Sequence, residues 1–201
     1  MIMDWEQFAS KVLSISRIGI KYSKDPYALE NYEDLEKLTV EMLNSTENSD
    51  YNGNIYERDI YPTPSTSVRI LVFNDKNELL MVQERDSGFW SVPGGWCDVF
   101  ESSSENAQKE VRQETGLHVK IDRILAVLQR EKYKDYKTLV SEYVHYYSGI
   151  VISGELTTNH ETTDVGFFPL EALPPLSRKS TFLEIMQAVK VYKRESDVVF
   201  D

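Results

Sequence analysis

Residues 95–117 read GWCDVFESSSENAQKEVRQETGL, a glycine-led turn that runs into a helix carrying two glutamates one turn apart. Glu110 and Glu114 stand at positions i and i+4, where like charges on an isolated helix repel each other by roughly a few tenths of a kcal/mol. Acidic residues at this spacing usually belong to a solvated face. Here, however, the step of about 100° per residue places both at the edge of the apolar stripe that contains Ala107 and Val111. We therefore expect the pair to lie in a cleft and to hold a cation.

The ends of this helix are marked in the sequence. Ser102 and Glu105 have the S-x-x-E spacing of a capping box, which predicts a helix from about Ser102 to Thr115. Gly116 then supplies a residue that tolerates positive φ where the helix ends. Before the helix, residues 93–95 read Pro-Gly-Gly, which predicts a turn whose backbone can approach a ligand with no side chain in the way.

The same stretch resembles the signature of the Nudix hydrolase family, G-x5-E-x7-R-E-U-x-E-E-x-G-U, in which U is a bulky apolar residue. The matching positions are Gly95, Glu101, Glu110, Val111, Glu114, Gly116 and Leu117. Two positions depart from the pattern, because Lys109 replaces an arginine and Gln113 replaces the first glutamate of a Glu-Glu pair. The spacing is long, so the match is far more specific than a short glycine motif would be.

The resemblance implies a Mg²⁺-dependent hydrolase, with Mn²⁺ as an alternative, in which water attacks a pyrophosphate bond. The metal ligands that it implies are Glu110, Glu114, the Gly95 carbonyl and, more weakly, the Gln113 amide. The missing carboxylate at Gln113 predicts weaker metal affinity. Glu101 fits a structural tie to Lys109, which is looser than a tie to arginine because lysine lacks the planar guanidinium fork.

Candidate groups from outside the helix complete the hypothesis. The general base is either Glu110 or a carboxylate from a distant loop. In that loop Glu161 is the first choice, as base or further ligand, and Asp164 is the second; the alternative is that both only solvate the loop. Arg69 and Arg85 could reach the phosphates of a substrate, or they could be exposed strand arginines without a specific role.

The composition is that of a globular chain without a membrane span. Of 201 residues, 41% are hydrophobic and 27% charged, and no apolar run approaches the roughly 20 residues of a membrane helix. The formal net charge of −11 repels nucleic-acid backbones and makes nucleic acid an unfavourable partner. It also requires cations to bridge a nucleotide substrate. The single Cys97 excludes an internal disulfide, and the first residues lack the features of a signal peptide, so we expect a cytoplasmic protein.

The first part of the chain has a pattern of its own. Apolar residues recur every three or four positions over 5–19 and 28–42, with a turn at 24–26, which predicts two amphipathic helices. Two such helices cannot bury both stripes alone, so they must cover the following domain or a second copy of the chain. We therefore expect residues 1–55 to form a helical N-terminal domain that supports a homodimer, with a polar linker over 44–54.

From residue 63 onward the pattern changes to short strands. The expected elements are strands at 68–73, 79–83, 121–128 and 142–152 and a last helix at 181–193. Residues 74–77, Asn-Asp-Lys-Asn, predict a hairpin between the first two strands. Strands with two covering helices favour an α/β/α arrangement, and the resemblance implies the Nudix α/β/α sandwich with a mixed sheet over residues 63–201.

A helical module ahead of the signature also resembles a bacterial Nudix subgroup that hydrolyses a nucleoside diphosphate linked to another moiety, X. Residues 22–26, YSKDP, and 173–176, LPPL, fit this subgroup. The resemblance implies ADP-ribose or a CDP-alcohol such as CDP-choline as the substrate, with a nucleoside monophosphate and X-phosphate as products. The alternative is a nucleotide-binding or regulatory Nudix protein with weakened catalysis, which the changes at Lys109 and Gln113 would permit.

Overall fold

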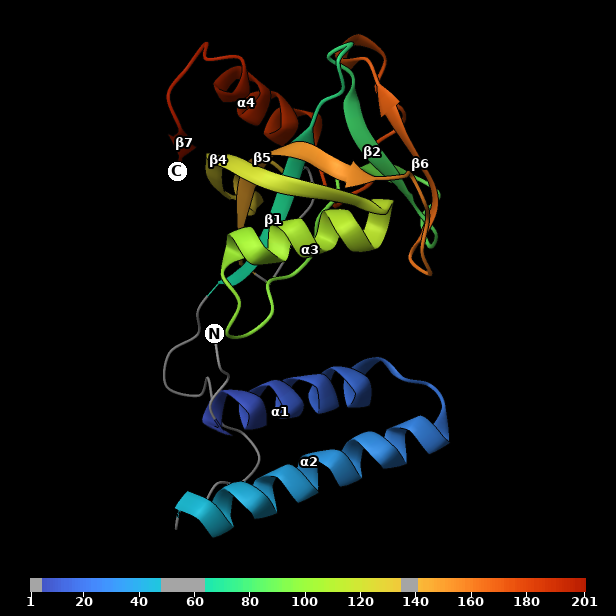
Figure 1. The fold of residues 1–201 in the computed structure, drawn as a ribbon, viewed down its shortest axis with the longest axis vertical. Coiled ribbons are helices and arrows are strands. Elements are labelled where there is room, and N and C mark those ends of the chain that lie inside the picture. The colour runs from blue at the N-terminus through green and yellow to red at the C-terminus, as the bar shows by residue number, and fades with distance from the viewer. Residues whose placement is uncertain (1–4, 48–63, 135–140) are drawn as a thin grey trace. The chain divides into compact units, whose positions relative to one another are not determined.

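The computed structural model describes residues 5–47, 64–134 and 141–201, and the chain divides into two compact units, Met1–Pro62 and Thr63–Asp201 (Figure 1). The first unit contains α1 (Trp5–Tyr22) and α2 (Pro26–Glu47). The second unit contains β1 (Ser65–Val72), β2 (Leu79–Glu84), β3 (Trp90–Ser91), α3 (Ser103–Thr115), β4 (Leu117–Gln129), η1 (Arg130–Lys132), β5 (Glu142–Gly154), β6 (Thr162–Phe168), η2 (Leu170–Ala172), α4 (Phe182–Tyr192) and β7 (Val199–Phe200).

The two predicted N-terminal helices are confirmed, and they pack together as a hairpin. Ala9 and Leu13 of α1 and Leu43 of α2 form its buried core. The helices approach closely where Gly19 meets Tyr32, because a Cβ on Gly19 would lie 2.3 Å from the tyrosine ring. α2 continues to Glu47, so the start of the linker expected at 44–54 is helical and the rest lies outside the described residues.

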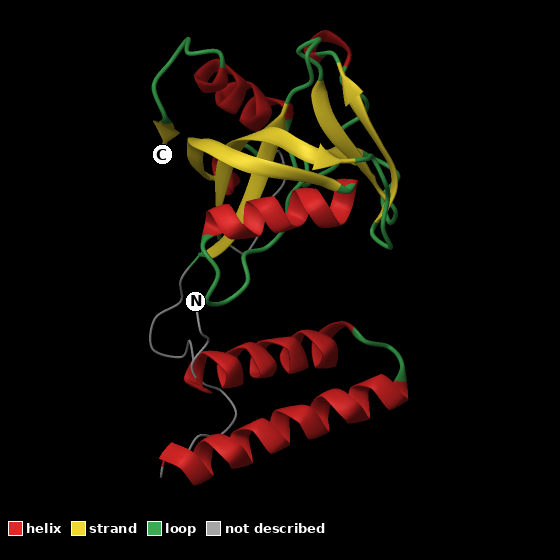
Figure 2. Cartoon of the chain, viewed as in Figure 1, coloured by secondary structure: helices red, strands yellow, loops and turns green. Residues whose placement is uncertain are grey.

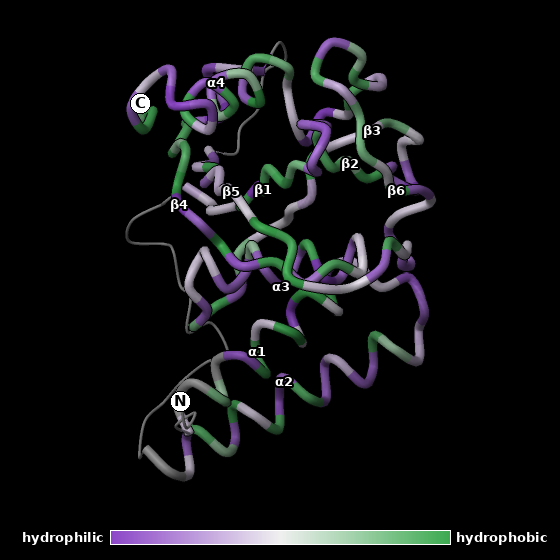
Figure 3. The backbone as a smooth tube through the Cα atoms, turned by 45° about the horizontal axis from the view of Figure 1, so that its top comes forward, coloured by the Kyte–Doolittle hydropathy of each residue, from purple (hydrophilic) through white to green (hydrophobic). Residues whose placement is uncertain are grey.

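The hairpin buries only some of its apolar side chains. Large side chains that stay exposed include Phe8, Ile15, Ile18, Leu35, Leu38 and Met42. Hydrophilic and hydrophobic stretches alternate along both helices (Figure 3). The small core buries only part of the apolar surface of the two helices. This agrees with the expectation that the helices also pack against another surface.

The second unit is an α/β/α sandwich with a mixed sheet, as predicted (Figure 2). Among the described residues, one sheet has the order β1-β5-β4-β7 and a second has the order β3-β2-β6. β1 is parallel to β5, whereas β4 is antiparallel to β5. Val111 of α3 packs with Val68 and Ile70 on one face of the first sheet. Ile185 of α4 packs with Leu71 on the other face.

The hairpin predicted between β1 and β2 is wrong beyond its turn. Asn74 does build a turn, because its Oδ1 accepts hydrogen bonds from the backbone N–H groups of Lys76 and Glu78, both at 3.0 Å. After the single antiparallel bridge between Phe73 and Leu79, however, the two strands diverge into different sheets. The edge of β1 is therefore left for another segment, and that segment carries the glycine turn of the site.

Candidate active site

α3 begins and ends where the sequence predicts. Ser102 is its N-cap: the Ser102 hydroxyl accepts the Glu105 N–H at 3.2 Å, and the Glu105 carboxylate accepts the Ser102 N–H at 2.8 Å. At the other end, Gly116 has a φ of 76° and donates its N–H to the Arg112 carbonyl. These caps fix the ends of the helix, and Glu114 lies on its buried side with Ala107 and Val111.

Residues 93–97 lie along the edge of β1 and bring the glycine turn against α3. The Val68 N–H donates to the Gly95 carbonyl at 2.9 Å. A Cβ on Gly94, whose φ is 148°, would lie 2.0 Å from the Val68 carbonyl oxygen. A Cβ on Gly95 would lie 2.7 Å from Glu110 Oε1. Neither glycine can carry a side chain unless β1 or Glu110 moves.

Glu114 is a buried acid with little direct support from the protein. Glu114 is only 4% exposed, and its Oε2 accepts a hydrogen bond from the Gly94 N–H at 2.8 Å. Burial raises the pKa of Glu114 to about 8; the Gly94 N–H acts in the opposite direction, and the charge of Glu110 raises the pKa further. A buried carboxylate of this kind is stable in its charged form only when positive charge lies beside it.

Glu110 has a raised pKa at this site. Glu110 is half-buried, and burial raises its pKa. The negative charge of Glu161 raises this pKa too, whereas Arg69 and Lys109 lower it. The role of Glu161 as base or further ligand stays a prediction.

The residues of the site fit a divalent cation such as Mg²⁺. Within residues 5–47, 64–134 and 141–201, no three His, Cys, Asp or Glu side chains gather closely enough to hold a metal ion by themselves. Mg²⁺ is, however, commonly held by one or two carboxylates together with water and substrate phosphates. Glu110 and Glu114 match this pattern. Gln113 is exposed and the Gly95 carbonyl already accepts a hydrogen bond, so their roles as further ligands stay predictions.

Lys109 makes the expected tie to Glu101 and a second tie that the sequence analysis missed. Its Nζ lies 2.6 Å from Glu101 Oε2 and also donates to Asp98 Oδ2. The ammonium has three donors, so it can hold two carboxylates of the loop before α3 at once. Asp98 stands 11 positions before Lys109, a separation without a helical or strand period, and no sequence signal connects the two.

Arg69 is buried, so the alternative of an exposed strand arginine is wrong for this residue. It is 3% exposed, and it donates from Nη1 to the Val68 carbonyl at 2.7 Å and from Nε to the Lys179 carbonyl at 3.2 Å. Its positive charge acts against the raised pKa values of both Glu110 and Glu114. Arg69 is therefore a fixed cation beside the carboxylates, and contact with a substrate phosphate stays a prediction.

Arg85 and Asp164 occupy the rim of the second sheet. Arg85 is exposed, and its guanidinium donates to backbone carbonyls of the loop before β6. Asp164 of β6 is also exposed. It lies opposite Gln83 of β2, and its Oδ1 accepts a hydrogen bond from the Val165 N–H at 2.8 Å. Substrate binding by Arg85 and catalysis by Asp164 stay predictions, and Glu161 is the carboxylate of this region that acts on Glu110.

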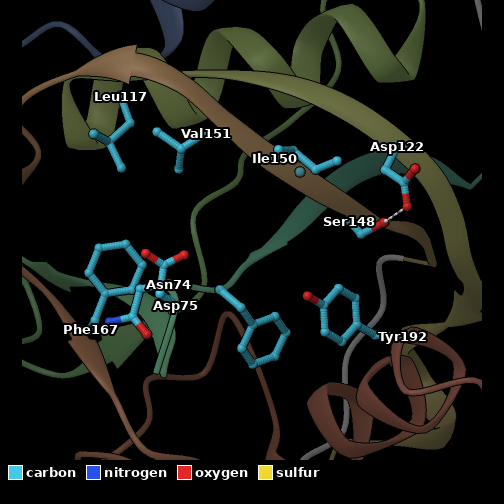
Figure 4. Close-up of a pocket in the computed structure, with 11 residues that line it drawn as sticks. Asn74, Asp75, Leu117, Asp122, Ser148, Ile150, Val151, Phe167 and Tyr192 are labelled. Atoms are coloured by element: carbon cyan, nitrogen blue, oxygen red, sulfur yellow. Dashed lines mark hydrogen bonds between the residues drawn. The ribbon is translucent and has the colours of Figure 1, made fainter. Parts of the chain in front are cut away.

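A separate cavity of about 550 Å³ lies between the two sheets. Phe167 and Tyr192 face Leu117, Ile150 and Val151 across it (Figure 4). Among the described residues, those that line this cavity include none of the candidate site residues. In the same described part of the chain, no helix combines the length and apolar character needed to cross a membrane.

Both units match known families. Residues 63–188 match the family described as the NUDIX domain. The chain belongs to the Nudix family. Residues 3–53 match the family described as the UDP-X-like, N-terminal oligomerisation domain, so a Nudix domain follows an oligomerisation domain in this chain.

Similar Nudix proteins cover nearly the whole chain. YjhB of Bacillus subtilis (strain 168), provisionally named an ADP-ribose pyrophosphatase, is 35% identical over 187 residues, which are 87% of this chain and 85% of YjhB. A crystal structure of a UDP-X diphosphatase is 29% identical with a TM-score of 0.68, and the match covers 98% of both chains. An ADP-ribose pyrophosphatase from Streptococcus suis is 35% identical with a TM-score of 0.60, over 69% of this chain and all (100%) of that one. The chain is thus a Nudix hydrolase.

Proposed function

We propose that this Nudix hydrolase is a divalent-cation-dependent pyrophosphohydrolase of a nucleoside diphosphate linked to a second moiety, with a nucleoside monophosphate and X-phosphate as products. The observation that carries the proposal is the buried Glu114 carboxylate one helical turn from Glu110, against the Gly94-Gly95 turn. ADP-ribose is the first candidate substrate, because YjhB and the Streptococcus suis protein carry that name. CDP-alcohols such as CDP-choline follow, and Mg²⁺ is the proposed cation with Mn²⁺ as an alternative.

Each residue of the site has a distinct part in this proposal. A divalent cation, when bound, would neutralise charge on the phosphate oxygens and lower the pKa of a bound water. Glu110 and Glu114 would hold it, and the fixed charge of Arg69 beside them would favour a phosphate nearby. Glu161 is exposed on the side of Glu110 and would accept the proton of the attacking water.

A substrate panel tests the proposal. The wild-type protein is incubated with Mg²⁺ and, in turn, ADP-ribose, CDP-choline, UDP-sugars, NADH and dinucleoside polyphosphates, and released nucleoside monophosphate is measured. We expect turnover of at least one nucleoside diphosphate-X compound that stops when the metal is chelated. Absence of product from every compound, with Mg²⁺ and with Mn²⁺, would contradict the proposal.

The second candidate is a nucleotide-binding Nudix protein with weakened catalysis. Gln113, which stands where the family has a carboxylate, is the residue that favours it. Calorimetry would then show binding of a nucleotide without product formation, and binding that persists without metal would favour this candidate further.

We also propose that the N-terminal unit makes the protein a homodimer. Its match to an oligomerisation domain and its exposed apolar side chains support this assembly. Leu38→Glu places a charge at a residue that is 62% exposed, and we expect it to raise the dimer dissociation constant by about 100-fold or more. Light scattering measures the mass over a dilution series.

The neighbouring exposed Lys37→Gln changes the net charge by the same amount and serves as the matched control for this prediction. It should leave the mass unchanged. A wild-type protein that stays monomeric at micromolar concentration, or a Leu38→Glu variant with the wild-type dissociation constant, would contradict the proposed dimer.

A further inference from the structure

The Arg85 side chain donates hydrogen bonds to the segment of residues 159–162, which carries Glu161. Its Nε donates to the His160 carbonyl at 2.8 Å. Its Nη2 donates to the Thr162 carbonyl at 3.1 Å and to the Asn159 carbonyl at 3.3 Å. One guanidinium therefore holds the carbonyls on both sides of Glu161, which a planar fork of donors can do and a point charge cannot.

The backbone N–H and the backbone carbonyl of Glu161 both make hydrogen bonds. Its carbonyl accepts the Arg85 N–H at 2.8 Å. Its own N–H donates to Asn159 Oδ1 at 2.8 Å, and the same oxygen accepts the Thr162 N–H at 3.0 Å. With its N–H and carbonyl both engaged, Glu161 is fixed in its main chain while its carboxylate remains 57% exposed.

The loop is also fastened to the helix that carries the metal-binding candidates. The Thr162 hydroxyl is close to the Glu114 carbonyl, at 3.3 Å, and Thr162 is only 1% exposed. The chain of contacts thus runs from Arg85, which directly follows β2, through the loop to the main chain of Glu114 in α3.

We propose that Arg85 is a positioning residue, which orders the 159–162 loop and so holds Glu161 in a fixed place beside α3. This inference rests on the proposed function, in which Glu161 serves the reaction. It differs from the prediction that Arg85 binds substrate phosphates, and it is supported by the hydrogen bonds from Nε and Nη2 to carbonyls of the protein. A group that acts only through Glu161 should affect the reaction rate rather than substrate affinity.

A double-mutant cycle on turnover tests the proposal. We expect Arg85→Gln to lower kcat by about 10- to 100-fold while KM changes little, as for other residues that orient a catalytic group. Arg85→Lys should restore only part of this loss. In a Glu161→Gln background, Arg85→Gln should cause no further loss, because the group that Arg85 positions has already been neutralised.

Two outcomes of the cycle would overturn the proposal. The first is a rise in KM with unchanged kcat, which would point to contact with the substrate. The second is an equal loss of kcat whether or not Glu161 is present. The control is Arg112→Gln, which replaces an exposed arginine of α3 and should leave both parameters at their wild-type values.

Amide hydrogen exchange gives an answer that does not depend on the substrate. Arg85→Gln should speed exchange at Glu161 and Thr162 by at least about 10-fold and leave α3 unchanged, because the carbonyl contacts that order the loop are lost. Arg112→Gln should change neither. If the wild type turns over no compound, the proposed function fails, and the exchange measurement still decides whether Arg85 orders the loop. Unchanged exchange at Glu161 in Arg85→Gln would overturn the positioning role.

Discussion

Glu114→Gln is expected to lower kcat by about 10³-fold or more, with no detectable change in the fold. Glutamine keeps the volume of the side chain and an oxygen that can accept the Gly94 N–H, which donates to Glu114 at 2.8 Å. It removes the formal charge, and a metal contributes several kcal/mol of transition-state stabilisation, where each 1.36 kcal/mol is a factor of about ten in rate. The measurement is turnover of the best substrate of the panel over a Mg²⁺ titration.

The stability of the metal-free protein separates this loss of activity from unfolding. The folded pKa of Glu114 is raised from 4.5 to about 8, mainly by burial, so the folded state binds its proton more tightly than the unfolded chain does. The free energy of unfolding of the wild type should therefore fall as the pH rises from about 4.5 through 8. Glu114→Gln lacks this ionisation, and at pH 9 we expect the metal-free variant to be more stable than the wild type by roughly a few kcal/mol.

A matched substitution and a contrary outcome complete this test. Glu171→Gln makes the same chemical change at an exposed residue of η2 and should alter neither kcat nor the pH dependence of unfolding. If Glu114→Gln turned over substrate at the wild-type rate, the metal site on α3 would be disproved. If it unfolded more readily than the wild type at pH 9, the argument from burial of an unsupported carboxylate would be wrong.

The helix α3, which carries the candidate metal ligands, could be predicted from sequence because its determinants are local. Ser102 and Glu105 cap one end and Gly116 the other, all within one stretch of the chain. The apolar stripe of Ala107 and Val111 faces inward, and on the same helix Glu114 is buried and Gln113 exposed. The α/β/α layers followed for a similar reason, since apolar periodicity marks the faces that strands and helices must bury.

The parts that could not be predicted depend on contacts between distant segments. The sequence leaves Arg69 as either a phosphate-binding residue or an exposed strand arginine, whereas the side chain is buried and its Nε donates to the carbonyl of Lys179, 110 positions later. Arg85 reaches carbonyls that lie 74 to 77 positions away. Backbone carbonyls have no residue identity, so no pattern of side chains announces such a partner.

The predicted hairpin between β1 and β2 and the N-terminal helices both show that local sequence patterns do not determine which elements pack together. Asn74 makes the expected turn, but turn chemistry does not determine which sheet the next strand joins, and β1 and β2 join different ones. In the N-terminal unit, Ala9, Leu13 and Leu43 form the core of the hairpin, whereas Leu38 remains exposed. The apolar periodicity predicts both helices, but it does not determine which apolar side chains pack between the helices and which remain exposed.

Arg130→Met is expected to destabilise the second unit by about 3–5 kcal/mol, the cost of leaving buried charges without their partner. Arg130 is 4% exposed and lies at the start of η1. Its Nε donates to Glu184 Oε1 at 3.0 Å, and its Nη1 donates to Glu142 Oε2 at 3.0 Å. Glu184 and Glu142 are 0% and 4% exposed, so neither carboxylate can turn to water. Denaturant titration of the full-length protein, followed by a probe of the second unit, measures the change.

In this variant, Glu184 should be the carboxylate that is left buried without a nearby cation. Glu142 keeps a second cation, because Lys134 Nζ lies 3.4 Å from its Oε2, and Ser67 still donates to its Oε1 at 2.6 Å. Adding Glu184→Gln to Arg130→Met should therefore recover much of the lost stability. Lys132→Met, at a side chain that is 53% exposed, is the control and should change the free energy of unfolding by less than about 1 kcal/mol.

The pH dependence decides whether charge or packing causes the loss in Arg130→Met. Burial by itself raises the pKa of Glu142, but the Ser67 hydrogen bond and the Arg130 charge outweigh it, so the folded pKa lies below 4.5. A carboxyl group with a lowered folded pKa contributes stability above its unfolded pKa and loses it as the pH falls through the folded value. Arg130→Met removes the positive charge that lowers the pKa of Glu142, so this carboxylate becomes easier to protonate and the difference from the wild type should shrink as the pH falls. A difference that stays constant with pH would mean that the guanidinium stabilises the fold by filling space, and that its ion pairs contribute nothing net.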